Sequence, residues 1–319
     1  MTGTVRVRAS IDRIATIALG TYREAVRTRL MLGVFALGQA ACVYSVVVAA
    51  MSAHNEERVV ADLGAASASL FGIVIAIVLG STSLYREVEY RTVFPILSRP
   101  IFRWEYLVGK YLGTVLTVAV FIALDAAATL MLLTLEAGIA PWKIGAVAAV
   151  FAGGLGATTA WLRRLDVFVI IPWAFALSVA AWTIATGSAD ERQLVTASAV
   201  LAVFEVGIIA AVATLFASFS SPFLTATCTF MVVVIGRSAD TLAHLPKKLF
   251  GSTMTAFGAG LARLVPNLHV YVPARSLLLG QVVGQRVWSY VSMAALQAVA
   301  YATALLVIGS IAFRRRDFS

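Results

Sequence analysis

Long apolar stretches, separated by short polar segments, occupy most of the chain. A helix needs about 20 residues to cross roughly 30 Å of hydrocarbon, and several stretches reach or approach that length. They are residues 31–51, 64–83, 111–135, 143–160, 167–186, 194–219, 223–242 and 290–313. Such continuous runs differ from the alternating pattern of a membrane β-barrel. The sequence therefore predicts an all-α, polytopic helical membrane protein with about 6–8 transmembrane helices.

Two of these stretches are weaker than the others. The stretch 143–160 is short and rich in glycine, so it fits either a full span or a broken, re-entrant segment. The stretch 223–242 is interrupted by Arg237, and only a weaker apolar tail follows. The region 143–186 is therefore compatible with two full spans or with fewer.

The composition excludes a soluble fold. Hydrophobic residues make up 60% of the chain and charged residues 13%, with a mean hydropathy of +0.90. Globular proteins carry about 25% charged residues, so this chain has too few to cover a water-exposed surface. The two cysteines, Cys42 and Cys228, lie in separate apolar stretches, which excludes a disulfide framework and a CxxC motif.

The distribution of basic residues predicts the orientation in the membrane. The chain carries 25 Lys and Arg against 16 Asp and Glu. Many basic residues fall in 1–30, in 84–110 and in a basic tail at 314–319, whereas the loop 52–63 is mainly acidic. Because basic loops mark the cytoplasmic side, we expect a multi-pass protein of the cell (inner) membrane with both termini cytoplasmic. The basic residues lie at the ends of loops and do not form a single basic face. This distribution excludes nucleic acid as a partner.

Residues 1–30 have the pattern of an amphipathic helix. Arginines lie between apolar residues that recur at helical spacing. These apolar residues are Ile11, Ile14, Ala18, Tyr22, Ala25 and Val26. We interpret the segment as a cytoplasmic helix in the membrane interface, with its apolar face in the acyl chains and its arginines toward the lipid headgroups. A solvated basic arm is the alternative.

The connection 84–110 is far longer than two neighbouring helices need. Glu87 and Arg91 are spaced for an ion pair on a helix. Pro95 would end that helix, and Pro100 suits the first turn of a second one. Because aromatic residues follow among charges, we interpret the segment as cytoplasmic coupling helices that fit a groove of a partner protein. A pair of interfacial helices held at the headgroups is the alternative.

Several segments resemble one family of membrane proteins. The run from Arg86-Glu-Val-Glu-Tyr-Arg-Thr through Leu97-Ser-Arg-Pro-Ile-Phe-Arg-Trp-Glu-Tyr-Leu-Val-Gly-Lys-Tyr-Leu-Gly113 is similar to the first cytoplasmic loop of ABC-2-type transporter permeases. Further similar segments are 22–30, 215–223, 265–268 and 313–318. The resemblance thus touches both ends and the middle of the chain. Because that family commonly has six spans, 143–186 looks like an added pair.

The resemblance implies the membrane-spanning subunit of an ATP-driven exporter. The chain contains no GxxxxGK[ST], HExxH or GxSxG motif, so we expect it to have no catalytic residue and to bind no metal or cofactor. ATP and Mg would belong to a separate cytosolic ABC ATPase subunit, in two copies, next to a second permease copy or a paralogue. The implied ATPase-coupling residues are Glu24, Arg27, Glu87, Glu89, Arg91, Thr92, Pro100, Arg103 and Trp104.

Two carboxylates, Asp125 and Glu205, lie within predicted spans. Charged groups at this depth are costly and usually face a cavity or a partner. They are candidates for a translocation path, or they are protonated or hydrogen-bonded carboxyls that pack helix against helix. A secondary, ion-coupled transporter with both carboxylates on its ion path is the alternative function. Such a transporter would not need the long cytoplasmic connection.

Two further features concern packing and the outer face. Gly109 and Gly113 are spaced for close helix packing at the start of the third span, either within the chain or between two permeases. The segment 243–289 contains three prolines and apolar patches. We interpret it as short outer-face helices that cover the protein, gate its exit or meet an extracytoplasmic partner.

Overall fold

The structure is a computed structural model that describes residues 3–52, 55–89, 102–161, 166–245, 247–282 and 286–314. Every regular element in this part of the chain is a helix. In chain order the helices are α1 (Gly3–Val26), α2 (Arg29–Ala49), α3 (Glu56–Glu89), α5 (Arg103–Glu136), α6 (Pro141–Trp161), α7 (Asp166–Ile184), α8 (Ala189–Ala217), α9 (Pro222–Arg237), α10 (Ala239–Ala243), α11 (Lys247–Leu264), the 3-10 helix η1 (Leu268–Tyr271), α12 (Arg275–Leu278) and α13 (Val287–Arg314). Within the described residues, seven helices are long and apolar enough to cross a membrane, namely α2, α3, α5, α6, α7, α8 and α13. The all-α, polytopic fold class is confirmed.

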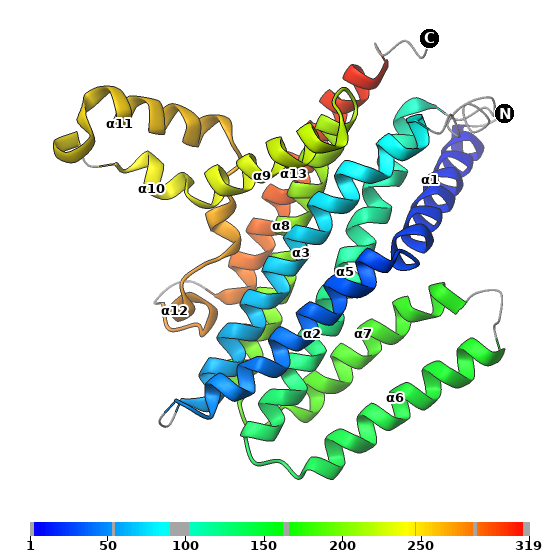
Figure 1. Ribbon diagram of the computed structural model, residues 1–319, viewed down its shortest axis with the longest axis vertical. Helices are drawn as coiled ribbons and strands as arrows, with labels where there is room; N and C mark the ends of the chain where they lie inside the picture. The colour runs from blue at the N-terminus through cyan, green and yellow to red at the C-terminus, as the bar shows by residue number, and fades with distance from the viewer. Residues whose placement is uncertain are drawn as a thin grey trace.

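The two ends of the helix bundle carry different elements (Figure 1). The start of α1, the end of α3, the start of α5 and the end of α13 lie at one end, which we call the α1 end. The turn between α2 and α3 and the short helix α12 lie at the opposite end, which we call the α12 end. The first and last helices of the chain therefore meet the same end of the bundle.

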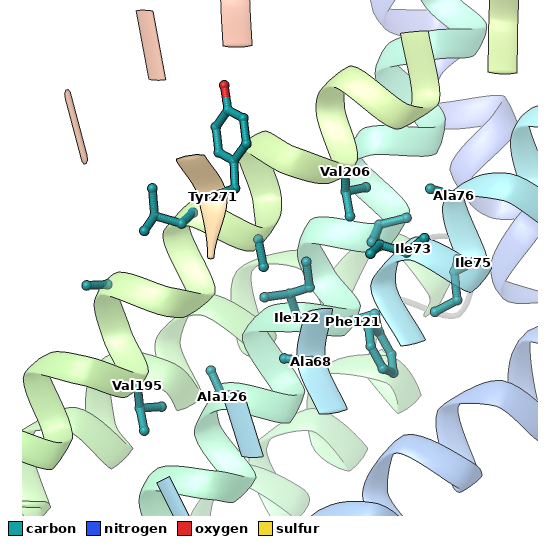
Figure 2. Packing of buried hydrophobic residues seen from close by; sticks show 14 of the residues in the cluster. Ala68, Ile73, Ile75, Ala76, Phe121, Ile122, Ala126, Val195, Val206 and Tyr271 are labelled. Carbon is teal, nitrogen blue, oxygen red and sulfur yellow. The ribbon is translucent and has the colours of Figure 1, made fainter. Parts of the chain in front are cut away.

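Helices α3, α5 and α8 form the centre of the bundle. Small residues bring them close together, because a Cβ on Gly80 of α3 would lie 2.5 Å from the Cβ of Ala213 in α8. Figure 2 shows buried side chains from these helices packed against one another, among them Ala68, Ile75, Phe121, Ile122, Ala126, Val195 and Val206. In lipid, the hydrophobic effect does not drive helices together, so close packing of this kind stabilises their association.

Helix α1 packs along the first part of α5. Ala18, Tyr22 and Ala25, which we expected to face acyl chains, are buried in the protein. Ile11 is 59% exposed and remains on the surface. Part of the face that was expected to lie in the acyl chains is therefore a protein contact, and the interfacial position of α1 stays a prediction.

Helices α3 and α5 extend well beyond the apolar stretches that predicted them. α3 remains helical to Glu89, and α5 begins at Arg103. The second expected coupling helix is thus the first part of α5 and is continuous with the third span. Three predicted coupling residues lie outside the described residues: Arg91, Thr92 and Pro100.

The region 143–186 forms two helices, α6 and α7, and its glycines do not break α6. Gly154 instead allows close contact, since a Cβ there would lie 2.2 Å from the Trp173 ring of α7. Phe151 packs edge-on against the same ring, with the centroids 5.3 Å apart. α6 otherwise stands apart from the central helices (Figure 1).

The expected span 223–242 is two helices. α9 has only 16 residues and ends at Arg237, which is short for roughly 30 Å of hydrocarbon. α10 follows after Ser238. At the end of α9 the Arg237 side chain points into the bundle and pairs with Glu205 of α8. We therefore correct this span to a 16-residue helix that is followed by the separate short helix α10.

The segment 243–289 contains α11, η1 and α12, in agreement with short helices. Gly251 has φ of 75° and kinks α11, which projects from the bundle together with α10 (Figure 1). The chain then returns to α13, where the Tyr271 hydroxyl donates to the Ala294 carbonyl at 3.1 Å. Tyr290 of α13 donates to the Val270 carbonyl at 2.6 Å. This part of the segment is thus fixed to the last span.

Candidate functional site

A buried carboxylate, Glu105 of α5, joins the helices at the α1 end. Arg13 of α1 donates to both carboxylate oxygens, with Nε 2.9 Å from Oε2 and Nη2 2.7 Å from Oε1. The Ser10 hydroxyl donates to Oε1 at 2.5 Å, and the Phe102 backbone N–H donates to Oε2 at 3.1 Å. The hydrogen bond from Arg13 to Glu105 raises the pKa of the Arg13 guanidinium. We call these four residues the Glu105 clamp.

Three further predicted coupling residues lie on α1 or on the first turn of α5. Glu24 Oε2 of α1 lies 3.8 Å from Lys110 Nζ of α5. Arg103 Nη1 donates to the carbonyl of Phe313 at 3.3 Å, which joins α5 to the end of α13. Trp104 is 46% exposed on the first turn of α5. The α1 end therefore holds α1, α5 and α13 together and still presents an exposed aromatic side chain.

The remaining predicted coupling residues are distributed along this region. Glu87 and Glu89 belong to the last turns of α3, which ends at the α1 end. Arg27 is exposed at the turn between α1 and α2. The described coupling residues therefore lie at the α1 end, except for Glu24 and Arg27, which lie near the junction of α1 and α2.

Gly109 and Gly113 both face α1. A Cβ on Gly109 would lie 2.7 Å from Ile17 Cβ, and a Cβ on Gly113 would lie 2.6 Å from the Ala18 carbonyl oxygen. Both glycines thus permit close packing within the chain. Because the atom closest to Gly113 is a backbone atom, a side chain there would displace α1 as a whole.

Asp125 is fully buried where α2, α3 and α5 meet. The Ser67 hydroxyl donates to Oδ2 at 2.9 Å, and the Gln39 amide donates to Oδ1 at 3.2 Å. The Cys42 thiol lies 3.5 Å from Oδ1 and 3.2 Å from the Thr129 hydroxyl. We call these five residues the Asp125 cluster. Its hydrogen bonds link three helices, which favours a packing role for this carboxyl.

Glu205 is fully buried and makes a bidentate ion pair. Arg237 Nε donates to Oε1 at 2.8 Å, and Arg237 Nη2 donates to Oε2 at 2.9 Å. Ser69 of α3 accepts from Arg237 Nη2 at 2.6 Å and donates to Glu205 Oε2 at 3.1 Å. Paired, hydrogen-bonded charges are the form in which ionic groups are tolerated inside a membrane protein. Glu205 therefore joins α3, α8 and α9.

A third set of ion pairs, centred on Arg275, lies at the α12 end. Arg275 of α12 donates to Asp62, near the start of α3, and to Glu191, near the start of α8. The acidic loop that was expected to lie outside thus supplies a partner for the segment 243–289. This contact fixes α12 to two central helices.

Two apolar cavities lie beside the central helices. One has a volume of about 480 Å³ and lies between α1, α2, α5, α6 and α7. The other, of about 420 Å³, lies between α5, α7, α8 and α13. Neither Asp125 nor Glu205 lines either cavity. No group of three or more His, Cys, Asp or Glu that could hold a metal ion occurs among the residues that the structure describes.

The sequence interpretation missed the ion pairs of Glu105, Arg237 and Arg275. A signal existed for Glu105, because it stands three residues after Phe102, the N-cap residue of α5. A Glu side chain at this position commonly accepts a hydrogen bond from the N-cap backbone N–H. A signal also existed for Arg237, because a lone Glu205 inside a span needs a partner. Neither signal identifies the partner.

We expect Asp125→Asn to be mild and Asp125→Leu to be harmful. Asparagine keeps an oxygen that accepts from Ser67, so the loss should be below about 1 kcal/mol, whereas leucine leaves buried donors without an acceptor and should cost about 2–3 kcal/mol. Unfolding in detergent measures both. Thr134→Val on the same helix is the control, because Thr134 hydrogen-bonds only locally to the Met131 carbonyl. Equal losses for both Asp125 variants would contradict the packing role.

The described residues form an all-helical bundle with seven candidate membrane-spanning helices and ion pairs between its helices, which is the architecture of a polytopic membrane protein. The model of the ABC-2 family transporter proteins matches residues 36–318. The chain belongs to this family and is the permease component of an ABC transporter, which works in general with an ATPase subunit. No curated protein that was compared with the chain matches it significantly.

Proposed function

We propose that the chain is the permease of an ATP-driven exporter and that a separate cytosolic ABC ATPase acts on its α1 end. Two ATPase copies and a second permease copy, or a paralogue, would complete the transporter. ATP and Mg would be bound by the ATPase. In this proposal the α1 end faces the cytoplasm at the cell (inner) membrane, and the α12 end faces outside.

The observation that supports this proposal most is the Glu105 clamp. It fixes α1 to the start of α5, and the hydrogen bond from Arg103 to the Phe313 carbonyl fixes α5 to α13. α3 ends at Glu89 and α5 begins at Arg103 at this same end, so the chain segment between these two residues connects the two helices. A force on that segment would therefore reach α5 first and carry α1 and α13 with it.

Through these contacts, a movement of the ATPase on ATP binding would be transmitted to the membrane-spanning helices. An ATPase that closes on ATP would press on the end of α3 and the start of α5 and tilt the attached helices between inward-facing and outward-facing states. The partner shifts that equilibrium only if it binds one state more tightly than the other. Exposed Trp104 and the charged end of α3 are the groups that would make this differential contact.

Charge reversal at the connection tests the proposal. We expect Glu87→Lys with Arg91→Glu to abolish recovery of the ATPase on pull-down, or to leave an assembled complex that no longer transports. The matched control is Glu57→Lys with Arg58→Glu, which reverses two charges near the other end of α3. Unchanged assembly and transport in the first variant would reject the proposal.

The same complex distinguishes an ion-coupled transporter. If the ATPase drives transport, Asp125→Asn and Glu205→Gln proteins that still fold should retain transport. Loss of transport in both, with the ATPase absent from the purified complex, would favour an ion path through these carboxyls.

A further inference from the structure

The cavity of about 420 Å³ between α5, α7, α8 and α13 opens on the surface of the bundle, and we call it the α7–α13 groove. Phe175 and Val179 of α7 and Trp288 of α13 line it and are exposed, Val179 to 63%. Buried Ile122 and Ala126 of α5 lie at its floor. Because α7 and α13 are both long and apolar enough to cross a membrane, the groove opens toward lipid.

The lining of the groove offers an occupant almost only apolar contacts. Its two hydroxyl groups belong to Ser178 and Thr196. The Ser178 hydroxyl donates to the Ala123 carbonyl at 2.7 Å, and the Thr196 hydroxyl donates to the Arg192 carbonyl at 2.8 Å. Both hydroxyls are therefore satisfied within the protein, so an apolar occupant leaves neither of them without a partner.

The length of the groove matches one leaflet of a bilayer. Its lining residues on α5 run from Ala119 to Leu130, eleven positions apart, which is about 16 Å along a helix. One leaflet supplies half of a hydrocarbon core of roughly 30 Å. A hydrocarbon chain that lies parallel to α5 in this groove would therefore span one leaflet.

Arg192 lies at one end of this groove. Its guanidinium carbon is 4.3 Å from the centre of the Trp182 ring, and its Nη1 donates to the Trp182 carbonyl at 3.4 Å. Trp182 lines the groove, and so does Thr196, one turn after Arg192 in α8. α7 ends at Ile184 and α8 begins at Ala189, so this is the end of the groove next to a helix connection. Tryptophan is enriched where membrane helices reach the headgroups.

The charge of Arg192 is not cancelled by a carboxylate among the residues that the structure describes. The acid next to it, Glu191, pairs with Arg275. Asp190 lies two positions before Arg192, and residues with this spacing do not face each other on a helix. Stacking on Trp182 uses the face of the guanidinium and leaves N–H groups at its edge. Arginine can bind phosphate oxygens with two parallel N–H groups of this kind.

We propose that the α7–α13 groove binds a phospholipid, with one acyl chain along α5 and the lipid phosphate at Arg192. The apolar lining holds the chain, and the guanidinium, oriented by the Trp182 ring, selects a lipid that carries a phosphate. In the orientation proposed above, this lipid belongs to the outer leaflet. The site goes beyond the proposed coupling to an ATPase, since it needs no ATP and no partner subunit.

The test uses the full-length protein, with any ATPase that purifies with it, and two lipids with the same acyl chains. Native mass spectrometry would compare 1-palmitoyl-2-oleoyl phosphatidylethanolamine with 1-palmitoyl-2-oleoyl glycerol, which has no phosphate. We expect the phospholipid to be favoured at least about ten-fold, the contribution of a hydrogen bond to a charged group. Arg192→Gln should remove that preference. Arg58→Gln, which removes an exposed arginine near the start of α3, should keep it. Equal retention of the two lipids by the unchanged protein, or equal effects of the two variants, would overturn the proposal.

A groove-filling variant tests where the acyl chain lies. Ala199 of α8 lines the groove and is half-buried, so Ala199→Phe should fill the groove and release the lipid. Ala176→Phe makes the same change at an exposed site of α7 that does not line the groove, and it should retain the lipid. Equal retention by both variants would contradict the proposal. Loss of self-association in Ala199→Phe with lipid binding unchanged would place a second copy of the chain in the groove and would also overturn it.

Fluorescence gives a second measurement that does not depend on filling the groove. Phosphatidylethanolamine with brominated acyl chains, added in equimolar amount to the protein, should quench Trp182 and Trp288, which both line the groove. The quenched component should disappear in Trp182→Phe with Trp288→Phe, and it should weaken in Arg192→Gln. Identical quenching in the unchanged protein and in the double tryptophan variant would show that the lipid binds elsewhere and would overturn the proposal.

Discussion

Arg237→Leu should lower the free energy of unfolding by about 3 kcal/mol, because it leaves the buried Glu205 carboxylate without its cation. Removing one partner of a buried ion pair typically costs about 3–5 kcal/mol. We take the lower end because the Arg237 side chain is 35% exposed and part of its pairing energy is screened. Among the residues that the structure describes, Ser69 would remain as the donor to Glu205. Unfolding in detergent, monitored by circular dichroism, measures the loss.

Two further proteins separate the ion pair from other effects. Arg58→Leu removes an arginine whose pair with Asp62 is exposed, so it should change stability by less than about 1 kcal/mol. The double variant Glu205→Leu with Arg237→Leu should lose less than the sum of the single losses, because it leaves no unpaired charge. If Arg237→Leu were as mild as Arg58→Leu, the ion pair of Arg237 with Glu205 would contribute little to stability, contrary to this prediction.

Hydropathy predicted the fold class well because lipid imposes a simple length requirement. Stretches of about 20 apolar residues became helices, including the glycine-rich α6. The length requirement applies only within the hydrocarbon region, so hydropathy did not predict where the helices begin and end outside it. α3 begins at Glu56, in sequence that was assigned to a loop, and α5 begins at Arg103, where a separate coupling helix was predicted.

Arg237 shows how the same method fails inside the bundle. A charge at the end of an apolar run looks like the end of a span, and the sequence cannot show that the side chain turns inward. The reason lies in Glu205, 32 residues away on another helix. A tertiary ion pair therefore holds the end of α9 against α8, and the residues around Arg237 do not identify this partner.

Helix α1 shows a related limit. Its apolar spacing predicted an amphipathic helix, and Ala18 and Tyr22 are indeed buried. Acyl chains and the apolar side of α5 both exclude water, so the pattern alone does not distinguish them. What fixes α1 to α5 is the pair of Arg13 and Glu105, which are 92 residues apart.

That pair leads to the second large effect, Glu105→Ala. The change removes the acceptor for Arg13, Ser10 and the Phe102 N–H at once. Hydrogen bonds to a charged group contribute about 1.5–3 kcal/mol each, and partial compensation by water at the partly exposed Arg13 brings the expected loss to about 3 kcal/mol. Amide hydrogen exchange should rise in α1 and stay unchanged in the centre of α8.

The functional consequence of Glu105→Ala depends on the role of the clamp as a mechanical link. If α1 and α5 move as one body, the variant should still recover its ATPase on pull-down but lose at least about ten-fold in transport, because the push on α5 no longer carries α1 with it. Glu136→Ala, at the far end of the same helix, is the matched control and should keep both properties. Faster exchange in α1 with full transport would show that the clamp stabilises the fold but does not transmit the force.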